Sequence, residues 1–333
     1  MKISAALRLS EARKEAHAIL GKVAKGGDPL AERRQKEAAA MNTLQSVCES
    51  YFAREGKKLR TVDERRTQLK RLVYPRLGSR QIDDVKRSDV VRLLDRVEDE
   101  NGPVMADRTL AYLRRVFSWH ARSDEFRSPI TRGMARTKPK ERARSRVLSD
   151  DELRAVWKAA GHMRNAFGPL VRFILLTATR LREAAHTQRS ELDGGLWVIP
   201  ASRYKGNHDH VLPMSKTAKA VIDALPVVDG SKWIFSHDGK RPVGGFSKFK
   251  ARLERASGTS GWTLHDPRRT ARSLMSRAGV PADHAERALG HVINGVRGTY
   301  DRHEYLAEKK AAFEALAEQI RRIITSWNCG ARS

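Results

Sequence analysis

Cysteine is scarce in this sequence. Its 333 residues include only Cys48 and Cys329, which stand far apart and form no CxxC pair. This pattern indicates neither a zinc site nor a disulfide framework, and it is typical of a protein that works in a reducing cytoplasm. A chain of this length can form two or three domains, each with a core that needs no such cross-links.

Long apolar runs and two catalytic signatures are also missing. No apolar stretch approaches the length that crosses a bilayer, and the N-terminus lacks the apolar core of a signal peptide. We therefore expect a soluble, cytoplasmic protein. There is no glycine-rich phosphate-binding loop and no carboxylate cluster of the two-metal kind, so we expect no cofactor.

Negative charge is scarce relative to positive charge. The chain has 65 Lys and Arg against 39 Asp and Glu, a net charge of +26. A polyanionic partner is implied, because each phosphate contacted releases condensed counterions and so adds salt-sensitive affinity. An anionic membrane surface would attract the same charge, but the sequence shows no strongly amphipathic basic helix and no lipidation signal. DNA or RNA is therefore favoured.

The N-terminal part of the chain is predicted to be helical. Residues 1–40 contain one predicted helix, 7–24, followed by the breaker Gly26-Gly27-Asp28-Pro29 and a charged run. Residues 41–125 predict a small all-helical domain, with Ser88 as a plausible N-cap. Its expected helices lie near 43–55, 61–73, 88–98 and 104–122.

A basic segment follows at 126–147. Residues 127–147 hold eight Lys or Arg and few apolar side chains, so an extended, positively charged linker is predicted. A solvated tether without a partner is the plainer alternative. The expected DNA contacts are Arg136, Lys138, Lys140, Arg142 and Arg144.

A second domain is predicted from residue 148. Ser149-Asp150-Asp151-Glu152 forms a capping box that starts its first helix, and an apolar helix follows at 169–177. Strand-like 196–200 and 210–213 flank a hairpin tip at 203–207. Helical patterns return at 215–225, 244–257, 267–279, 281–290 and 306–326. We therefore predict a mainly α protein with a small β-sheet.

Separated segments of this second domain carry side chains suited to phosphoryl chemistry. In chain order they are Arg180 with Glu183, Lys205, His265 with Arg268, and His291 followed by Tyr300. Taken alone, each residue is more simply explained as a solvated or structural side chain. Their joint order and spacing is what points to a common site.

That order resembles the tyrosine recombinases of the phage integrase type. The similar segments are TATRLRE at 177–183 (first arginine box), RYK at 203–205 ahead of HVLP at 210–213 (hairpin lysine), HDPRRT at 265–270 (His-x-x-Arg box) and LGH at 289–291 (second histidine). Tyr300 stands nine residues after His291, the family's spacing for the nucleophile. The resemblance implies a mixed α/β catalytic domain over 148–305, with a C-terminal helix and tail over 306–333.

The resemblance extends less specifically toward the N-terminus. Residues 41–125 are similar to the family's helical, SAM-like core-binding domain, and residues 1–40 to the tail of an arm-binding domain that is mostly missing. Two departures stand out. Ala178 takes the place of the usual Gly, a mild change unless the backbone needs a positive φ, and Pro267 takes a place commonly held by Leu.

The chemistry of a tyrosine attacking a phosphodiester explains the residue types. Negative charge gathers in the transition state, and the paired donors of Arg180 and Arg268 suit its non-bridging oxygens. Lys205 suits protonation of the departing 5′ oxygen, and His265 is the expected base for Tyr300. A 3′-phosphotyrosine keeps the bond energy, so neither ATP nor a metal is required.

Supporting roles follow from the same chemistry. His291 would hydrogen-bond the phosphate, and Glu183 would orient Arg180 or His265, although an ordinary surface salt bridge is its alternative. The expected partners are duplex attachment sites, a homotetramer on paired sites and DNA-bending or excision accessory proteins.

Several alternatives remain open on the sequence. The chain could be a DNA-binding protein of the same fold without catalysis, or a topoisomerase using the same phosphotyrosine. Tyr305 is an internal rival to Tyr300. The apolar face of 306–326 could pack on its own domain or dock on a neighbouring subunit.

Overall fold

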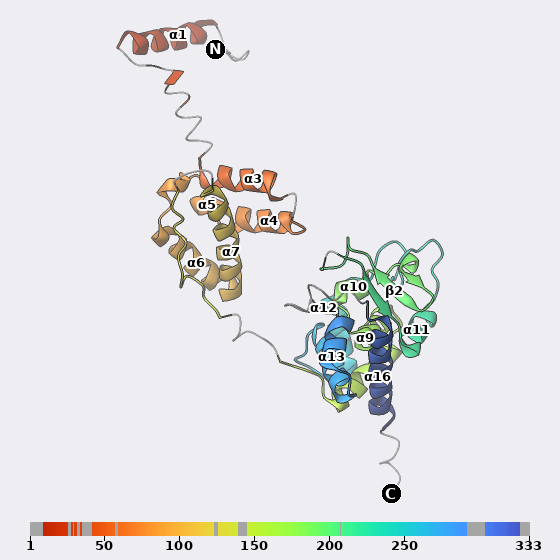
Figure 1. The fold of residues 1–333 in the computed structure, drawn as a ribbon. Helices are drawn as coiled ribbons and strands as arrows, with labels where there is room; N and C mark the ends of the chain where they lie inside the picture. The colour runs from red at the N-terminus through yellow and green to blue at the C-terminus, as the bar shows by residue number, and fades with distance from the viewer. Residues whose placement is uncertain are drawn as a thin grey trace. The chain divides into compact units, whose positions relative to one another are not determined.

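The protein folds into two units, Met1–Ala143 and Arg144–Ser333. The computed structural model describes residues 9–25, 28, 30–31, 34, 42–56, 59–122, 126–138, 145–206, 208–291 and 304–326. Helices dominate both units, and the strands of the described residues form one three-stranded sheet in the second (Figure 1). The predicted class, mainly α with a small β-sheet, is confirmed.

The first unit is helical throughout. Its helices are α1 (Leu9–Ala24), α3 (Leu44–Arg54), α4 (Val62–Leu72), α5 (Tyr74–Leu77), α6 (Arg87–Asn101) and α7 (Pro103–His120), with a 3-10 turn at Ile82–Asp84. Helices α3 to α7 share one apolar core. Helices α6 and α7 form a hairpin because Gly102 adopts a φ of 82° and Pro103 can begin the next helix.

The N-cap expected at Ser88 is wrong. Helix α6 already begins at Arg87, so Ser88 lies inside its first turn. The side chain that caps this end is Asp89, whose carboxylate accepts a 3.0 Å hydrogen bond from the Lys86 N–H. An acidic side chain in the first turn satisfies a free backbone donor and favours the positive end of the helix dipole.

The first half of the predicted linker is not extended. Residues 126–138 pack on the helical unit, where Phe126 stacks on Phe117 and Met134 is buried. The Asp107 carboxylate accepts hydrogen bonds from the backbone N–H groups of Arg136 (2.6 Å) and Thr137 (3.1 Å). At the far end, the Leu148 N–H donates to the Thr270 hydroxyl at 2.9 Å, so the second unit holds that end.

The second unit places a small sheet beside a helical core. Its helices are α8 (Asp150–His162), α9 (Phe167–Thr177), α10 (Leu181–Ala185), α11 (Lys216–Asp223), α12 (Phe246–Ser257), α13 (Asp266–Arg277), α14 (Ala282–Ala288) and α16 (Leu306–Thr325). The antiparallel sheet has the order β1 (Leu192–Asp193), β2 (Leu196–Ile199), β3 (His210–Pro213). Strands β2 and β3 pair as the predicted hairpin, with Ile199 opposite His210.

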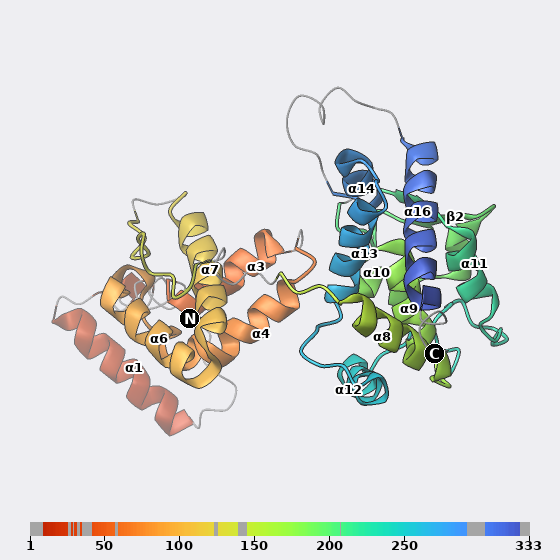
Figure 2. The same cartoon turned by 90° about the horizontal axis from the view of Figure 1, so that it is seen from below.

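Helix α9 is the centre of this unit. Its sequence FGPLVRFILLT is apolar on almost every side, and Arg172 is its one charged residue. A helix apolar all round must be surrounded. Helices α8, α10, α11, α12, α13 and α16 all contact it (Figures 1 and 2). The C-terminal end of α9 is therefore fixed by the core, and the chemistry-bearing residues begin just beyond it.

The apolar face of α16 packs on its own unit. Phe313, Leu316, Ile320 and Ile323 are buried in the core shared with α9 and α13. Of the two sequence-based alternatives, packing on its own domain is therefore confirmed for α16 as described. Within the described residues, no helix is both long enough and apolar enough to span a bilayer.

Candidate active site

Arg180 follows a tight turn of the backbone at the C-terminal end of α9. The helix ends at Thr177, and Ala178 adopts the left-handed conformation with φ 51° and ψ 25°. Arg180 is then extended and forms the N-cap of the short helix α10. The chain thus leaves the buried core and turns Arg180 into a position where its side chain keeps 30% exposure.

Glu183 fixes the direction of Arg180. Its carboxylate accepts hydrogen bonds from the Arg180 backbone N–H (2.9 Å) and from Nη1 (2.6 Å). The Glu183 side chain is only 6% exposed, so this pair is not an ordinary surface salt bridge. Although burial opposes it, the Glu183 contact raises the pKa of Arg180 above its ordinary value. The guanidinium stays charged and oriented.

Arg268 lies on the first turn of α13 and is almost fully buried. Its Nη1 donates to the Ala178 carbonyl at 2.6 Å, and its Nη2 donates to the Leu289 carbonyl at 3.0 Å. These bonds join the ends of α9 and α14 at one guanidinium. Burial, and next the nearby charge of Arg180, lowers the pKa of Arg268 to about 10. It is still protonated at neutral pH.

His291 is held between Arg268 and Glu286. The Arg268 Nη2 donates to His291 Nε2 at 3.0 Å, and His291 Nδ1 lies in hydrogen-bond contact with a Glu286 carboxylate oxygen. Since a guanidinium can only donate, Nε2 must accept, so the proton of the neutral ring sits on Nδ1. Arg272 donates to the other Glu286 oxygen at 2.8 Å. The ring orientation is therefore fixed from two sides.

His265 stands at the N-cap of α13, one turn from Arg268. Its side chain is exposed. The protein around the ring still displaces part of its water, and this partial burial, and next the charges of Arg269 and Arg268, lowers the pKa of His265 below its ordinary value. A neutral imidazole is the form that can accept a proton.

The β2–β3 hairpin brings Lys205 toward the same place. Arg203 pairs with the buried Glu191 and donates to the Glu183 carbonyl at 3.0 Å. Tyr204 is 1% exposed, and its hydroxyl donates to the Gly290 carbonyl, next to His291. The Arg180 guanidinium lies 5.8 Å from the Tyr204 ring centroid. Lys205 itself is exposed.

The structure thus brings together most, but not all, of the expected residues. Arg180, Glu183, His265, Arg268 and His291 gather where α9, α13 and α14 end or begin. Tyr300 lies outside the described residues. Its rival Tyr305 is the N-cap residue of α16, and the Arg287 guanidinium lies 3.7 Å from its ring centroid.

The expected linker contacts fall into two groups. Lys140, Arg142 and Arg144 lie outside the described residues. Arg136 turns its guanidinium to the acidic residues Asp95 and Glu98 (3.3 Å), so its charge is compensated within the first unit. Lys138 is largely solvent-accessible at the end of the segment that packs there.

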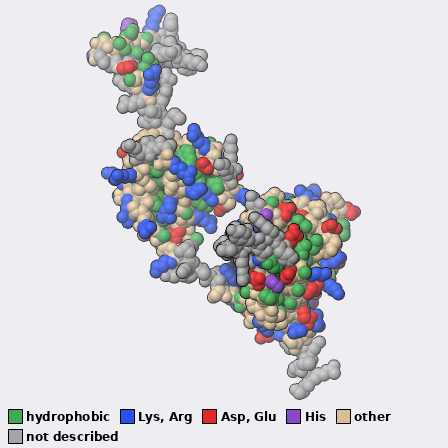
Figure 3. All heavy atoms as spheres, in the orientation of Figure 1, with side chains coloured by type: hydrophobic (Ala, Val, Ile, Leu, Met, Phe, Trp, Pro, Cys, Tyr) green, Lys and Arg blue, Asp and Glu red, His purple; other side chains and the backbone are tan. Residues whose placement is uncertain are grey.

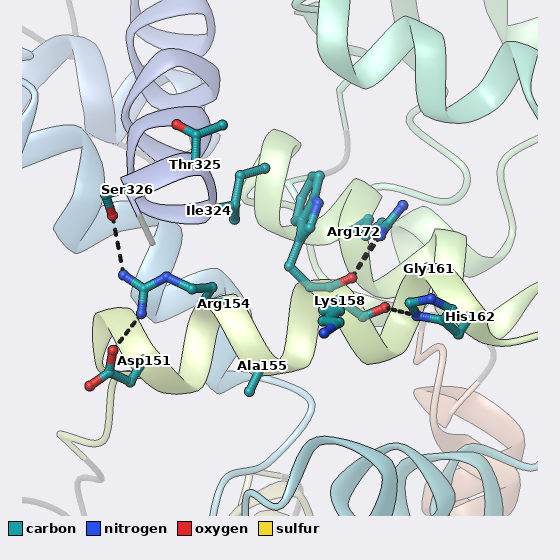
Figure 4. Close-up of a pocket in the computed structure, with 11 residues that line it drawn as sticks. Asp151, Arg154, Ala155, Lys158, Gly161, His162, Arg172, Ile324, Thr325 and Ser326 are labelled. Carbon is teal, nitrogen blue, oxygen red and sulfur yellow. Dashed lines mark hydrogen bonds and ion pairs between the residues drawn. The ribbon is translucent and has the colours of Figure 1, made fainter. Parts of the chain in front are cut away.

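A hollow of about 1280 Å³ lies elsewhere in the second unit. Helix α8, the middle of α9 and the C-terminal end of α16 line it (Figure 4). Arg172 lies over the Trp157 ring at 4.9 Å, and Arg154 donates to the Ser326 hydroxyl at 3.2 Å. None of the expected catalytic side chains lines this hollow. Among the described residues, no group of three or more His, Cys, Asp or Glu could hold a metal ion.

Three site residues were missed by the sequence analysis: Tyr204, Glu286 and Gly290. Tyr204 and Gly290 lie inside the RYK and LGH motifs, but the sequence analysis gave them no role. The glycine directly before His291 could have indicated a position where a side chain does not fit. Gly290 has a φ of 68°, and a Cβ there would lie 1.9 Å from the Tyr204 hydroxyl, so no other residue fits. Nothing in the sequence marks Glu286 as a site residue, since an acidic side chain on an amphipathic helix usually faces solvent.

Two family models match the chain. The phage integrase central domain matches residues 44–135, and the phage integrase family matches residues 146–305. Prophage integrase IntZ of Escherichia coli (strain K12) is 27% identical over 96% of this chain and 82% of its own length.

Solved structures share the fold. The Tn1549 transposon integrase in complex with transposon right end DNA has a TM-score of 0.62 at 17% identity, covering 83% of this chain and 99% of that one. A lambda integrase tetramer bound to a Holliday junction has a TM-score of 0.58 at 18% identity, covering 89% and 88%. The chain belongs to the phage integrase family, and it is a tyrosine-type site-specific recombinase.

Proposed function

We propose that Arg180, Arg268 and His291 bind the scissile phosphate of duplex DNA and that Tyr300 attacks it. The observation that carries this assignment is the convergence of the buried Arg268 guanidinium with Arg180 and His291. Two cations held close together lower each other's pKa, and an anion between them relieves that repulsion. Fixed donors of this kind stabilise the charge that develops on a phosphate under attack.

The reaction balances without any added group. The Tyr300 oxygen forms a bond to phosphorus as the bond from phosphorus to the 5′ oxygen breaks. His265 takes the tyrosine proton, and Lys205 gives a proton to the departing oxygen. The 3′-phosphotyrosine keeps the bond energy, so a 5′ hydroxyl from another strand can reverse the step and complete an exchange.

The remaining parts of the chain have supporting roles in this proposal. Residues 41–125 bind the core site, and the basic segment 126–147, including Lys138, Lys140, Arg142 and Arg144, adds phosphate contacts. Residues 1–40 resemble the tail of an arm-binding domain, and we assign them to contacts with DNA outside the core site. The solved lambda integrase tetramer on a Holliday junction supports a homotetramer on paired sites, and accessory DNA-bending proteins would assist. The prophage integrase relative supports a mobile element as the DNA, moved in the cytoplasm.

Covalent trapping tests the proposal. Purified protein is incubated with nicked duplexes spanning candidate prophage ends, and protein–DNA adducts are resolved on a denaturing gel. We expect an adduct with wild type and none with Tyr300→Phe, which should still bind the same duplex. Binding without any adduct would favour a regulator that has lost catalysis. Relaxation of supercoiled plasmid lacking such a site, without strand exchange, would favour a topoisomerase.

A further inference from the structure

The side chain before the hairpin lysine has an unusual environment for a turn residue. Tyr204 is 1% exposed, whereas its neighbours Lys205 and Gly206 are exposed. Its ring stacks on His210 with centroids 4.7 Å apart and planes 20° apart. His210 begins β3, so this contact ties the turn to the strand that follows it.

The Tyr204 hydroxyl ties the hairpin to the histidine segment. It donates to the Gly290 carbonyl, across 86 residues of sequence, one residue before His291. Gly290 has no Cβ, which would lie 1.9 Å from this hydroxyl and 2.9 Å from the His210 ring. Burial raises the pKa of Tyr204, so the phenol keeps the proton that it donates.

Lys205 needs such a constraint more than the arginines do. Glu183 holds Arg180, and two carbonyls and His291 hold Arg268. The Lys205 side chain is exposed, and a lysine has four rotatable carbons between backbone and ammonium. Arg203 secures the hairpin on the other side through Glu191. The residue directly before Lys205, Tyr204, is by contrast fixed by its buried ring and its hydroxyl.

We infer that Tyr204 is a positioning residue for proton transfer by Lys205, acting through its hydrogen bond to the Gly290 carbonyl. This inference rests on the proposed function. The hydroxyl sets where the turn lies relative to Arg180, Arg268 and His291, and hence where the ammonium meets the departing 5′ oxygen. The hydroxyl also contacts Arg180, but Glu183 still holds that guanidinium when the hydroxyl is lost, so phosphate binding is retained. Loss of the hydroxyl therefore mainly slows the step in which the 5′ oxygen takes up its proton.

The leaving group separates this role from general support of the fold. A bridging sulfur in place of the 5′ oxygen departs without a proton, so a defect in proton donation disappears on that substrate. Tyr204→Phe keeps the ring and its stacking on His210 and removes only the hydroxyl. Thr325→Val is the matched control, because it removes a hydroxyl that donates to the Arg321 carbonyl within α16.

The experiment compares adduct formation by the full chain on nicked prophage-end duplexes with bridging oxygen or bridging sulfur. With oxygen, we expect Tyr204→Phe to be slower than wild type by about tenfold, the effect of one lost hydrogen bond of about 1.4 kcal/mol. Lys205→Ala should be slower by about a hundredfold or more. On the sulfur substrate, Tyr204→Phe and Lys205→Ala should each approach the wild-type rate. Thr325→Val should match wild type on the oxygen and the sulfur substrate.

Each other outcome is decisive. Equal defects of Tyr204→Phe on the two substrates, or no defect on either, would overturn the inference in favour of a purely structural tyrosine. Failure of sulfur to rescue Lys205→Ala would overturn it as well, because Lys205 would not be the acid. Absence of an adduct with wild-type protein on both substrates would instead refute the proposed function itself.

Discussion

Arg268 carries a positive charge into the protein interior. It is 4% exposed, and its hydrogen bonds to described residues go to two carbonyl oxygens and one imidazole, none to a carboxylate. A buried charge without a direct counter-ion is costly, and the lowered pKa reflects that cost. In the proposed function, the scissile phosphate supplies the missing negative charge, so DNA binding would recover part of the cost of burying Arg268.

The pKa of His265 predicts the acid side of the pH–rate profile. Only the neutral ring accepts the tyrosine proton, and burial with the charges of Arg269 and Arg268 lowers the pKa of His265. Adduct formation should therefore fall to half only below a pH of about 6.5, the ordinary histidine value. Arg269→Gln removes one of these charges, raises the His265 pKa and should move the fall to higher pH.

Arg277→Gln is the control for that experiment. Arg277 is also on α13, but it pairs with Asp150 at 2.6 Å rather than acting on His265. Its profile should coincide with wild type. A fall centred above pH 6.5 in wild type, or a profile unmoved by Arg269→Gln, would exclude His265 as the base.

Ala178 shows what the sequence could not supply. A Gly-to-Ala departure is mild in most backbone conformations, but the structure has φ 51° here, in the left-handed region. An L side chain in this region costs about 1–2 kcal/mol. The buried methyl group recovers about 0.8 kcal/mol of that cost.

Two substitutions test this balance. Ala178→Gly should change the free energy of unfolding by less than about 1 kcal/mol, because relieved strain and lost burial nearly cancel. Ala178→Val should lower it by more than about 2 kcal/mol, since a branched side chain fits neither this conformation nor the filled core. Urea unfolding followed by tryptophan fluorescence measures both. A stable Val variant would mean that the turn is not left-handed.

At the level of helices and strands, hydrophobic periodicity predicted the long helices correctly. The charged composition of residues 126–138, in contrast, led to a wrong prediction for that segment. The capping box at Ser149 and the apolar run of α9 have local causes, and both are where the sequence placed them. The short helices α5 and α10 were not predicted, because four or five residues carry too little periodicity.

The segment 126–138 was predicted as a linker because charge dominates it. Its few apolar residues, Phe126, Ile130 and Met134, nevertheless pack against the helical unit. Arg136 adds two contacts to acidic residues that are distant in sequence. Its backbone N–H donates to Asp107, and its guanidinium pairs with Asp95. Such pairing depends on tertiary structure, so no local pattern could reveal it.

Helix α16 is predicted to stabilise its own unit. Phe313 is 1% exposed in the core, and its replacement by Ala should lower the free energy of unfolding by about 3–5 kcal/mol. Lys310→Ala, on the exposed side of the same helix, should change it by less than about 0.5 kcal/mol. Thermal unfolding followed by circular dichroism measures both. A Phe313→Ala protein that is fully stable yet fails to assemble on paired DNA sites would instead favour docking between subunits.

At the level of the whole molecule, the class of protein could be predicted from the sequence more fully than the geometry of its site. The order of the motifs pointed to a recombinase, and the family matches cover both units. Lys and Arg side chains are spread widely over the drawn face of the helical unit (Figure 3), as expected of a surface that meets a polyanion. The contacts that orient the candidate catalytic side chains, those of Tyr204, Glu286 and Gly290, became visible only in the folded chain.

Peptide mapping shows which residue becomes linked to DNA, which we propose to be Tyr300. Trypsin separates the two candidates, since Tyr300 falls in Gly298–Arg302 and Tyr305 in His303–Lys309. The trapped adduct is digested with trypsin and nuclease, and the peptide carrying the residual nucleotide is sequenced by mass spectrometry. We expect the nucleotide on Tyr300. A nucleotide on Tyr305, or on any other residue, would contradict this assignment.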